Sequence, residues 1–205
     1  ARVTELFCNF CATGVGKTEM AESLARALCW PQKFFPLGQS GGGTGTLAWK
    51  LFGPEPGYVG SQTGGELTQF LRANPESVIV FDEFEKPLHN DPTFFQSLLN
   101  LLSEGRVKDN SCGQTYDASH CIVIFTSNLL AHEPDLDHLD GAQLKSLLGA
   151  QTGLPQEFLG RIRGVVPFRG LQPIEVEQIA KNIVGGMLTK FLAHNQLKHV
   201  HVDKV

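Results

Sequence analysis

The sequence predicts an α/β fold with a parallel central sheet, and three observations lead to that prediction. Short apolar runs typical of strands alternate along the chain with segments whose apolar residues recur at helical spacing. The run at 77–81 is continuously apolar and rich in Val and Ile, as expected for a strand buried on both faces. A glycine-rich turn follows the first run and leads directly into a helix, which is the context of a phosphate-binding loop.

The elements are expected in the following order. Strands are predicted at five short apolar runs, 3–10, 33–37, 77–81, 121–125 and 165–168. Helices are predicted where apolar residues recur every three or four positions, at 19–28, 46–52, 65–73, 93–103 and from Pro173 onward. Two polar, turn-rich segments, 105–117 and 129–152, are predicted as loops, and 38–45 is a third loop rich in glycine.

The turn between the first strand and the first helix, residues 11–18, reads Cys-Ala-Thr-Gly-Val-Gly-Lys-Thr. Glycines allow backbone N–H groups to converge on one point, and the helix N-terminus adds partial positive charge there. Lys17 adds a full positive charge, and Thr18 offers its hydroxyl to Mg²⁺. The alternative interpretation is a glycine turn beside a surface lysine.

Two acidic residues, Asp82 and Glu83, follow the strand predicted at 77–81. The carboxyl ends of parallel strands form the ligand-binding edge of an open sheet, and two carboxylates there need a cation or a partner. Asp82 is therefore predicted to hold Mg²⁺, and Glu83 to polarise the attacking water. Asn128 follows the next predicted strand, where its amide is placed to orient the same water. A solvated pair of turn acids is the alternative.

Composition limits the partners and the compartment. The net charge of −4 gives no basic field of the kind that holds nucleic acid, and no apolar run reaches membrane-spanning length. No nucleic-acid or membrane partner is therefore expected. The five cysteines are expected to be free thiols in the cytoplasm or another reducing compartment. Cys8 and Cys11 have a metal-like spacing, but without a second pair they are interpreted as structural thiols.

Seven segments carry motifs that resemble one family when taken together. They are Gly-Val-Gly-Lys-Thr-Glu at 14–19, Pro-Gly-Tyr-Val-Gly at 56–60, Gly-Gly-Glu-Leu-Thr at 64–68, Ser-Val-Ile-Val-Phe-Asp-Glu-Phe-Glu-Lys at 77–86, Glu-Gly-Arg-Val-Lys-Asp at 104–109, Thr-Ser-Asn at 126–128 and Glu-Phe-Leu-Gly-Arg-Ile at 157–162. Their order and sequence resemble the Clp-type AAA+ ATPases, most closely the second ATPase domain of ClpA/ClpB-like protein unfoldases and disaggregases. The second and third motifs in succession are specific to this branch.

The resemblance implies a P-loop NTPase fold of the AAA+ type, with a parallel five-stranded sheet of order 5-1-4-3-2 flanked by helices. It implies a large nucleotide-binding subdomain at 1–172 and the beginning of a small helical lid at 173–205, within a longer protein. The implied function is ATP hydrolysis in a ring, expected to be a hexamer, that threads polypeptide through a central pore. Adaptor proteins are candidate partners.

The resemblance also assigns site residues, with ATP and Mg²⁺ as cofactors. The residues implied to bind the nucleotide are Thr13, Gly14, Val15, Gly16, Lys17, Thr18, Glu19 and Asp82, with Thr18 and Asp82 on the metal. The implied catalytic residues are Glu83 as base, Asn128 as sensor and Arg161 as the arginine finger that reaches into a neighbouring subunit. Tyr58 and Val59 would form the substrate-gripping first pore loop, and 105–117 a second loop. From the residues alone, Tyr58 fits equally an exposed loop tip and a turn residue folded back on the core.

The chain departs from the family pattern at several positions. Cys11 replaces the first glycine of the phosphate loop, and 37–51 is glycine-rich where the family has an acidic stretch. Gly160 and Arg163 differ from the usual surroundings of the finger, which leaves both Arg161 and Arg163 as candidates. These departures favour an alternative function, a nucleotide-responsive AAA+ scaffold with weak or no hydrolysis. The intact set of Lys17, Asp82, Glu83 and Asn128 favours the hydrolysing unfoldase.

Overall fold

A computed structural model describes residues 5–10, 16–38, 46–58, 62–87, 91–128, 136–168 and 170–194. The chain divides into two units, Ala1–Arg169 and Gly170–Val205. Within the described residues, no helix combines the length and the apolar character needed to cross a membrane.

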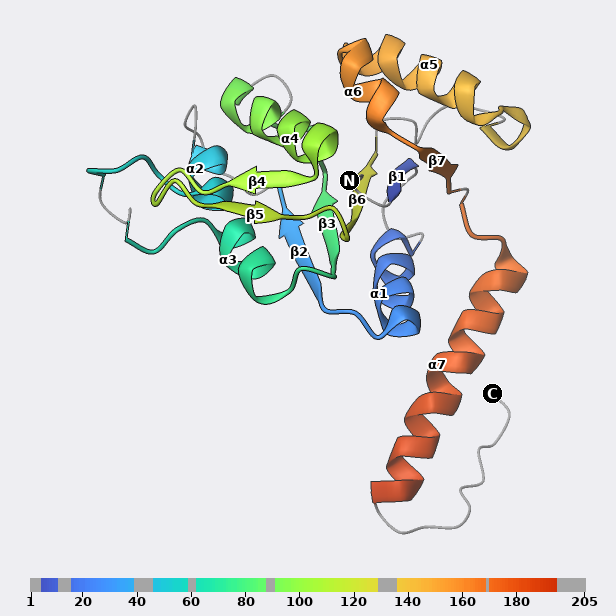
Figure 1. Ribbon diagram of the computed structural model, residues 1–205. Coiled ribbons are helices and arrows are strands. Elements are labelled where there is room, and N and C mark those ends of the chain that lie inside the picture. The colour runs from blue at the N-terminus through green and yellow to red at the C-terminus, as the bar shows by residue number, and fades with distance from the viewer. Residues whose placement is uncertain are drawn as a thin grey trace. The chain divides into compact units, whose positions relative to one another are not determined.

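The central sheet of the first unit has five strands, all parallel (Figure 1). They are β1 (Glu5–Phe10), β2 (Gln32–Pro36), β3 (Val78–Asp82), β6 (Ile122–Ser127) and β7 (Gly164–Pro167). Their order across the sheet is β2-β3-β6-β1-β7. Numbered along the chain within this sheet alone and read from the β7 edge, that order is 5-1-4-3-2.

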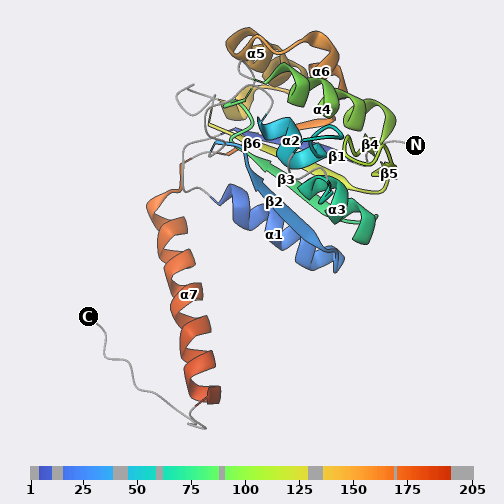
Figure 2. The same cartoon turned by 90° about the vertical axis from the view of Figure 1, so that its left-hand side faces the viewer.

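Helices cover both faces of this sheet. Those of the first unit are α1 (Lys17–Leu28), α2 (Thr46–Phe52), α3 (Glu66–Ala73), α4 (Pro92–Glu104), α5 (Gly141–Thr152) and α6 (Gln156–Arg161). Figure 2 shows α1 and α4 on opposite sides of the sheet. Side chains of α2, α3, α4 and α6 share one apolar cluster, and α1 belongs to another.

The buried strand β3 contributes side chains to the apolar clusters on both faces of the sheet. Val78 and Val80 pack in the cluster that contains Ala21 and Ala25 of α1. Ile79 and Phe81 pack in the larger cluster on the other face, and all four β3 residues are 2% exposed or less. Because successive side chains of a strand point to opposite faces, a strand covered on both sides must be apolar at every position. This is the pattern that predicted the strand.

Two segments that the sequence analysis treated as loops contain regular structure, so those predictions were wrong. The segment 105–117 forms an antiparallel hairpin of β4 (Arg106–Lys108) and β5 (Thr115–Asp117). The segment 129–152 contains a short 3-10 turn, Leu136–His138, and the helix α5. Strands of three residues are too short to show a period, which is why the sequence did not reveal the hairpin.

Helix α5 depends on its N-terminal cap. The side chain of Asp140 accepts hydrogen bonds from the N–H groups of Ala142 and Gln143, at 2.9 and 2.8 Å. The Gln143 side chain accepts in return from the Asp140 N–H, at 2.9 Å. This reciprocal capping box satisfies N–H groups that a helix start otherwise leaves unpaired. The local cap, rather than a strong apolar pattern, marks where this helix begins.

The second unit is described by the helix α7 (Pro173–His194). A helix was predicted from Pro173 onward, and the observed one begins there. None of its side chains is buried. Several large apolar residues along it are exposed, among them Ile174, Val176, Ile183, Met187 and Phe191.

Asp91 and Asp140 both cap helices, and we expect them to contribute unequally to stability. Asp91 is 4% exposed and accepts from Phe94 N–H at 2.9 Å and from Ala48 N–H at 3.3 Å, so it joins α4 to α2. Asp91→Ala removes a cap and leaves a buried N–H unpaired, so it should cost about 2–3 kcal/mol of unfolding free energy. Asp140→Ala, at an exposed cap, should cost about 1 kcal/mol. Urea unfolding at neutral pH measures both, and equal costs would contradict the tie between α4 and α2.

Candidate functional site

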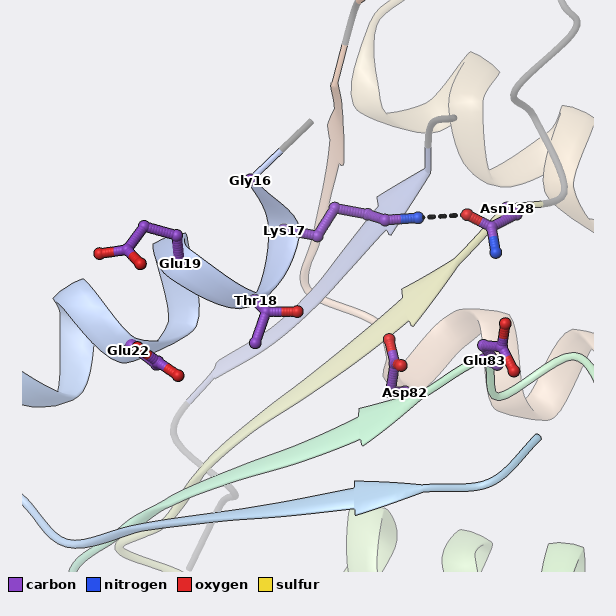
Figure 3. A pocket seen from close by; sticks show the side chains of 8 residues that line it. All are labelled: Gly16, Lys17, Thr18, Glu19, Glu22, Asp82, Glu83 and Asn128. Atoms are coloured by element: carbon purple, nitrogen blue, oxygen red, sulfur yellow. Dashed lines mark hydrogen bonds between the residues drawn. The ribbon is translucent and has the colours of Figure 1, made fainter. Parts of the chain in front are cut away.

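A cavity of about 360 Å³ lies at the carboxyl-terminal edge of the sheet (Figure 3). The residues that line it are Gly16, Lys17, Thr18, Glu19, Glu22, Asp82, Glu83 and Asn128. They come from the start of α1 and from the ends of β3 and β6. The strand register brings them together, because β1 pairs with β6 as far as Ser127, and β3 pairs with β6 as far as Phe125. Residues that follow these parallel strands therefore reach one edge.

Lys17 crosses the cavity toward the end of β6. Its Nζ donates to Asn128 Oδ1 at 2.5 Å and to the Ser127 carbonyl oxygen at 3.0 Å (Figure 3). Gly16, the residue before α1, has φ 95°, a left-handed conformation that favours glycine. Two oxygen acceptors hold the Lys17 ammonium at the site where an anion would meet the helix N-terminus.

Asp82 is fixed by a neighbouring strand. Its Oδ1 accepts a hydrogen bond from the hydroxyl of Thr126, a buried residue of β6. Figure 3 shows the Thr18 hydroxyl and the Asp82 carboxylate facing the same part of the cavity. Hydroxyl and carboxylate oxygens are the hard ligands that Mg²⁺ takes in proteins, usually together with water. This donor set fits a magnesium ion held by Thr18 and Asp82.

Glu83 stands in a turn with an uncommon backbone conformation, φ 54°. The next residue anchors that turn, since Phe84 N–H donates to the Thr126 carbonyl oxygen at 3.2 Å. The Phe84 ring is buried, with its centroid 5.4 Å from that of Phe125 and 6.1 Å from that of Phe158. A left-handed backbone conformation is costly for a residue with a side chain. Such a conformation persists only where the surrounding structure imposes it. The aromatic core therefore determines where the Glu83 carboxylate lies.

Gly38 gives a physical reason for one departure from the family pattern. A Cβ atom at this position would overlap Glu83 Oε2. The absence of a side chain at 38 thus leaves space for the Glu83 carboxylate beside the end of β2. Gly38, the first residue of the glycine-rich segment 38–45, is thus matched to the acidic residue opposite.

Sequence reasoning missed two residues that position the site, Thr126 and Glu85. Glu85 Oε1 accepts from the backbone N–H of Asn128 at 3.3 Å. Within the described part of the chain, its Oε2 is buried and has no hydrogen-bond partner. The spacing Asp-Glu-Phe-Glu was visible, but nothing in it showed that the second glutamate would turn toward the next strand. Glu85, Asn128 and Lys17 form one continuous set of contacts.

Comparison with known proteins now decides the family. Residues 6–165 match the family model described as AAA domain (Cdc48 subfamily). The chain is 36% identical over 198 residues to "Chaperone protein ClpB" of Mycobacterium bovis, which covers 96% of this chain and 22% of that protein. The chain is a Clp-type AAA+ domain. It is 37% identical over 175 residues to "Chaperone protein ClpB 2" of Thermosynechococcus vestitus and over 173 residues to "Chaperone protein ClpB" of Clostridium perfringens. In both cases 82% of this chain is covered, and the chain spans about a fifth of these relatives' length.

The expected nucleotide residues that the structure describes all line one cavity of the AAA+ domain. Its cavity contains Gly16 to Glu19, Asp82, Glu83 and Asn128. Thr13, Gly14, Val15 and the substituted Cys11 lie outside the described residues, as does Val59 of the expected pore loop. Arg161 is the last residue of α6, is exposed, and does not line the cavity. Arg163 is also exposed.

Tyr58 lies on the surface of the AAA+ domain. Its side chain is 53% exposed, and its ring centroid is 5.0 Å from that of Trp49 in α2, which is itself 41% exposed. Of the two positions that the sequence allowed, an exposed tip and a turn folded back on the core, the observed one is exposed. The contact with Trp49 could not be read from the sequence.

The buried residue Asp109 holds the base of the segment that carries Tyr58. Its Oδ2 accepts from Gly65 N–H at 3.1 Å and from the Thr68 hydroxyl, and its Oδ1 from Ser111 N–H at 2.9 Å. Gly53, Gly64 and Gly65 approach so closely that a Cβ on any of them would come within 3 Å of Asp109 or of neighbouring backbone. The Asp109 carboxylate thus joins the Gly65 end of segment 53–65 to the β4–β5 hairpin, and the next residue, Asn110, holds the Gly53 end by donating its side-chain N–H to the Gly53 carbonyl oxygen at 3.3 Å.

The pKa of Asp109 makes this clamp testable. Burial raises the pKa of the Asp109 carboxyl, but the hydrogen bonds from Ser111, Thr68 and Gly65 outweigh it and leave the pKa below its ordinary value. A lowered pKa in the folded state adds stability above the ordinary carboxyl pKa, and that stability is lost as the pH falls through the lowered value. The unfolding free energy of wild type should therefore exceed that of Asp109→Asn most at neutral pH, and the difference should shrink as the pH falls below the ordinary carboxyl pKa. Denaturant unfolding at a series of pH values measures it, and a pH-independent difference would refute the charged clamp.

Proposed function

We propose that this AAA+ domain hydrolyses ATP with Mg²⁺ in a ring, expected to be a hexamer, and that hydrolysis drives a polypeptide through the central pore. The observation that carries the proposal is the meeting of Lys17, Asp82, Glu83 and Asn128 at one edge of the sheet. The relatives of this chain carry the name chaperone, which supports a protein substrate. The same proposal assigns α7 to a small helical lid subdomain and includes adaptor proteins as partners.

In the proposed reaction the side chains have separate tasks. Lys17 and the N-terminus of α1 bind the phosphates, and Mg²⁺ on Thr18 and Asp82 supplies further positive charge to them. Glu83 accepts a proton from the attacking water, and Asn128 orients that water. Glu85 fixes the backbone of Asn128 through its hydrogen bond at 3.3 Å. Thr126 performs the equivalent task for Asp82.

The proposal needs a neighbouring subunit because Arg161 does not line the cavity of its own chain. A side chain at the exposed end of α6 is suited to contact a second copy. An arginine finger supplied by a neighbour stabilises the charge that develops in phosphoryl transfer, which is typically worth about 10³–10⁵ in rate. Arg163, two residues further on, is the second candidate for this role.

The alternative function, a nucleotide-responsive AAA+ scaffold with weak or no hydrolysis, rests on Cys11 and on the altered surroundings of the finger. The glycine at position 38 does not count in favour of the scaffold, because it leaves space for the Glu83 carboxylate.

The chain has an odd number of cysteines, which we interpret as free thiols. Free thiols support a reducing compartment such as the cytoplasm.

Glu83→Gln separates hydrolysis from binding. The amide keeps the volume of the side chain but removes the base, so ATP should still bind while turnover falls by a factor on the order of 10² or more. Lys17→Ala should weaken ATP binding itself, because it removes the charge on the phosphates. Both are measured on the full-length protein by equilibrium binding of a fluorescent ATP analogue and by phosphate release.

Glu76→Gln is the matched control, because Glu76 is exposed just before the other end of β3. It should leave binding and turnover unchanged. Full turnover in Glu83→Gln would remove the catalytic assignment. Weak or absent turnover in the wild-type ring would instead support the scaffold.

A mixing experiment tests the finger. A ring made only of Arg161→Ala subunits should be inactive, although each subunit still binds nucleotide. Mixing them with Glu83→Gln subunits should restore part of the turnover, because some interfaces then pair an intact finger with an intact base. Wild-type turnover in Arg161→Ala would move the role to Arg163 or exclude a finger from this helix end.

A further inference from the structure

Trp49 and Tyr58 form an exposed aromatic pair that lies outside the packed core of the domain. The ring centroids are 5.0 Å apart, the planes are inclined by 46°, and the side chains are 41% and 53% exposed. The other apolar residues of α2, namely Leu47, Ala48, Leu51 and Phe52, are all 3% exposed or less. Trp49 therefore lies off the face by which α2 packs on the core. A large ring kept in water beside a second ring indicates a contact surface.

The backbone holds this pair in place. Gly53, with φ 85°, ends α2 and donates its N–H to the Trp49 carbonyl oxygen at 2.9 Å. Tyr58 N–H donates to the Glu55 carbonyl oxygen at 3.3 Å, with Pro56 and Gly57 between them and φ 98° at the glycine. Proline second and a left-handed glycine third are the features of a type II turn. The turn directs the Tyr58 ring to the last turn of α2.

The clamp at Asp109 fixes the other end of the same segment. Gly65, where the segment returns to α3, donates its N–H to Asp109 at 3.1 Å. Asn110 N–H donates to the Phe52 carbonyl oxygen at 2.8 Å, beside the residue where the segment begins. Both ends of 53–65 are thus tied to the β4–β5 hairpin. The segment that carries Tyr58 is therefore anchored at both ends, as we expect for a surface on which a substrate pulls.

We propose that Trp49 acts with Tyr58 as one aromatic unit, and that Trp49 is a second side chain that grips the polypeptide. The inference rests on the proposed function, in which Tyr58 and Val59 are the residues expected from the sequence to grip the polypeptide. A surface that must hold any sequence needs flat apolar area at a low cost in rotamer entropy, and two adjacent rings provide it. The exposed neighbours Lys50 and Glu55 have opposite charges, so the surface does not select a charged ligand. An extended, uncharged stretch of polypeptide is the occupant that fits.

The test uses the full-length protein with a non-hydrolysable ATP analogue and a fluorescein-labelled synthetic peptide of about 20 uncharged residues, alternating apolar and polar. Fluorescence anisotropy gives the dissociation constant. Trp49→Ser should weaken binding roughly threefold to tenfold, and Trp49→Phe, which keeps a ring, by less than about twofold. Lys50→Ser, the adjacent exposed position on the same helix, is the matched control and should bind as wild type. Thermal unfolding and basal ATPase should be unchanged in all three, because Trp49 lies outside the core and the cavity.

A fourth variant, Tyr58→Ala, makes the outcomes distinguishable. It should lose both peptide binding and unfolding of a tagged fluorescent reporter. If Tyr58→Ala loses them while Trp49→Ser matches wild type, Trp49 is no gripping residue and the proposed function stands. If both variants bind and unfold as wild type, the threading function fails and this inference fails with it. If sedimentation velocity shows that Trp49→Ser no longer assembles into the subunit ring, and peptide binding is lost only together with that assembly, Trp49 is a subunit contact and the inference is overturned.

Discussion

The parallel pairing of β1, β6 and β3 is the constraint on which the rest of the structure depends. Because these strands run in one direction, the residues that follow them reach the same edge of the sheet. The pairings Phe10–Ser127 and Phe81–Phe125 set how far each strand extends there. A shift of one residue in either register would move every side chain of the strand to the opposite face of the sheet, into the wrong apolar cluster, so the packing of both layers protects the geometry of the site. The apolar runs that build the sheet and the polar residues at its edge are parts of one arrangement.

Within that arrangement, Asp82, Asn128 and Lys17 are each held by a hydrogen bond to a residue remote in sequence. Thr126 bonds to Asp82, Glu85 to the backbone of Asn128, and Asn128 to Lys17. Glu83 is placed by the buried ring of Phe84 and by the space left at Gly38. A site preorganised in this way loses little to reorganisation when charge develops. The segment that carries Tyr58 is positioned in the same way, because Asp109 binds Gly65 on one side of it and Asn110 binds Phe52 and Gly53 on the other.

The sequence was sufficient where a property is carried by neighbouring residues. The strand at 77–81, the glycine at the start of α1 and the acids that end β3 are all local patterns. The sequence was insufficient where the partner is remote, as for Asp109 with Gly65, Thr126 with Asp82 or Glu85 with Asn128, which are 44, 44 and 43 residues apart. The hairpin β4–β5 and the helix α5 were missed for a related reason. The hairpin is formed by only three pairs of residues, and α5 begins at a side-chain cap. Neither feature produces a periodic apolar pattern in the sequence.

The central claim is that the carboxyl edge of this sheet binds a magnesium nucleotide through Lys17, Thr18 and Asp82. The most direct test is an experimental structure of the full-length protein with Mg²⁺ and a non-hydrolysable ATP analogue. The account predicts Lys17 Nζ on a phosphate oxygen, with Thr18 on the metal and Asp82 bound to it directly or through its water. It also predicts Glu83 and Asn128 facing the terminal phosphate. A nucleotide bound elsewhere, or a metal without contact to either Thr18 or Asp82, would contradict it.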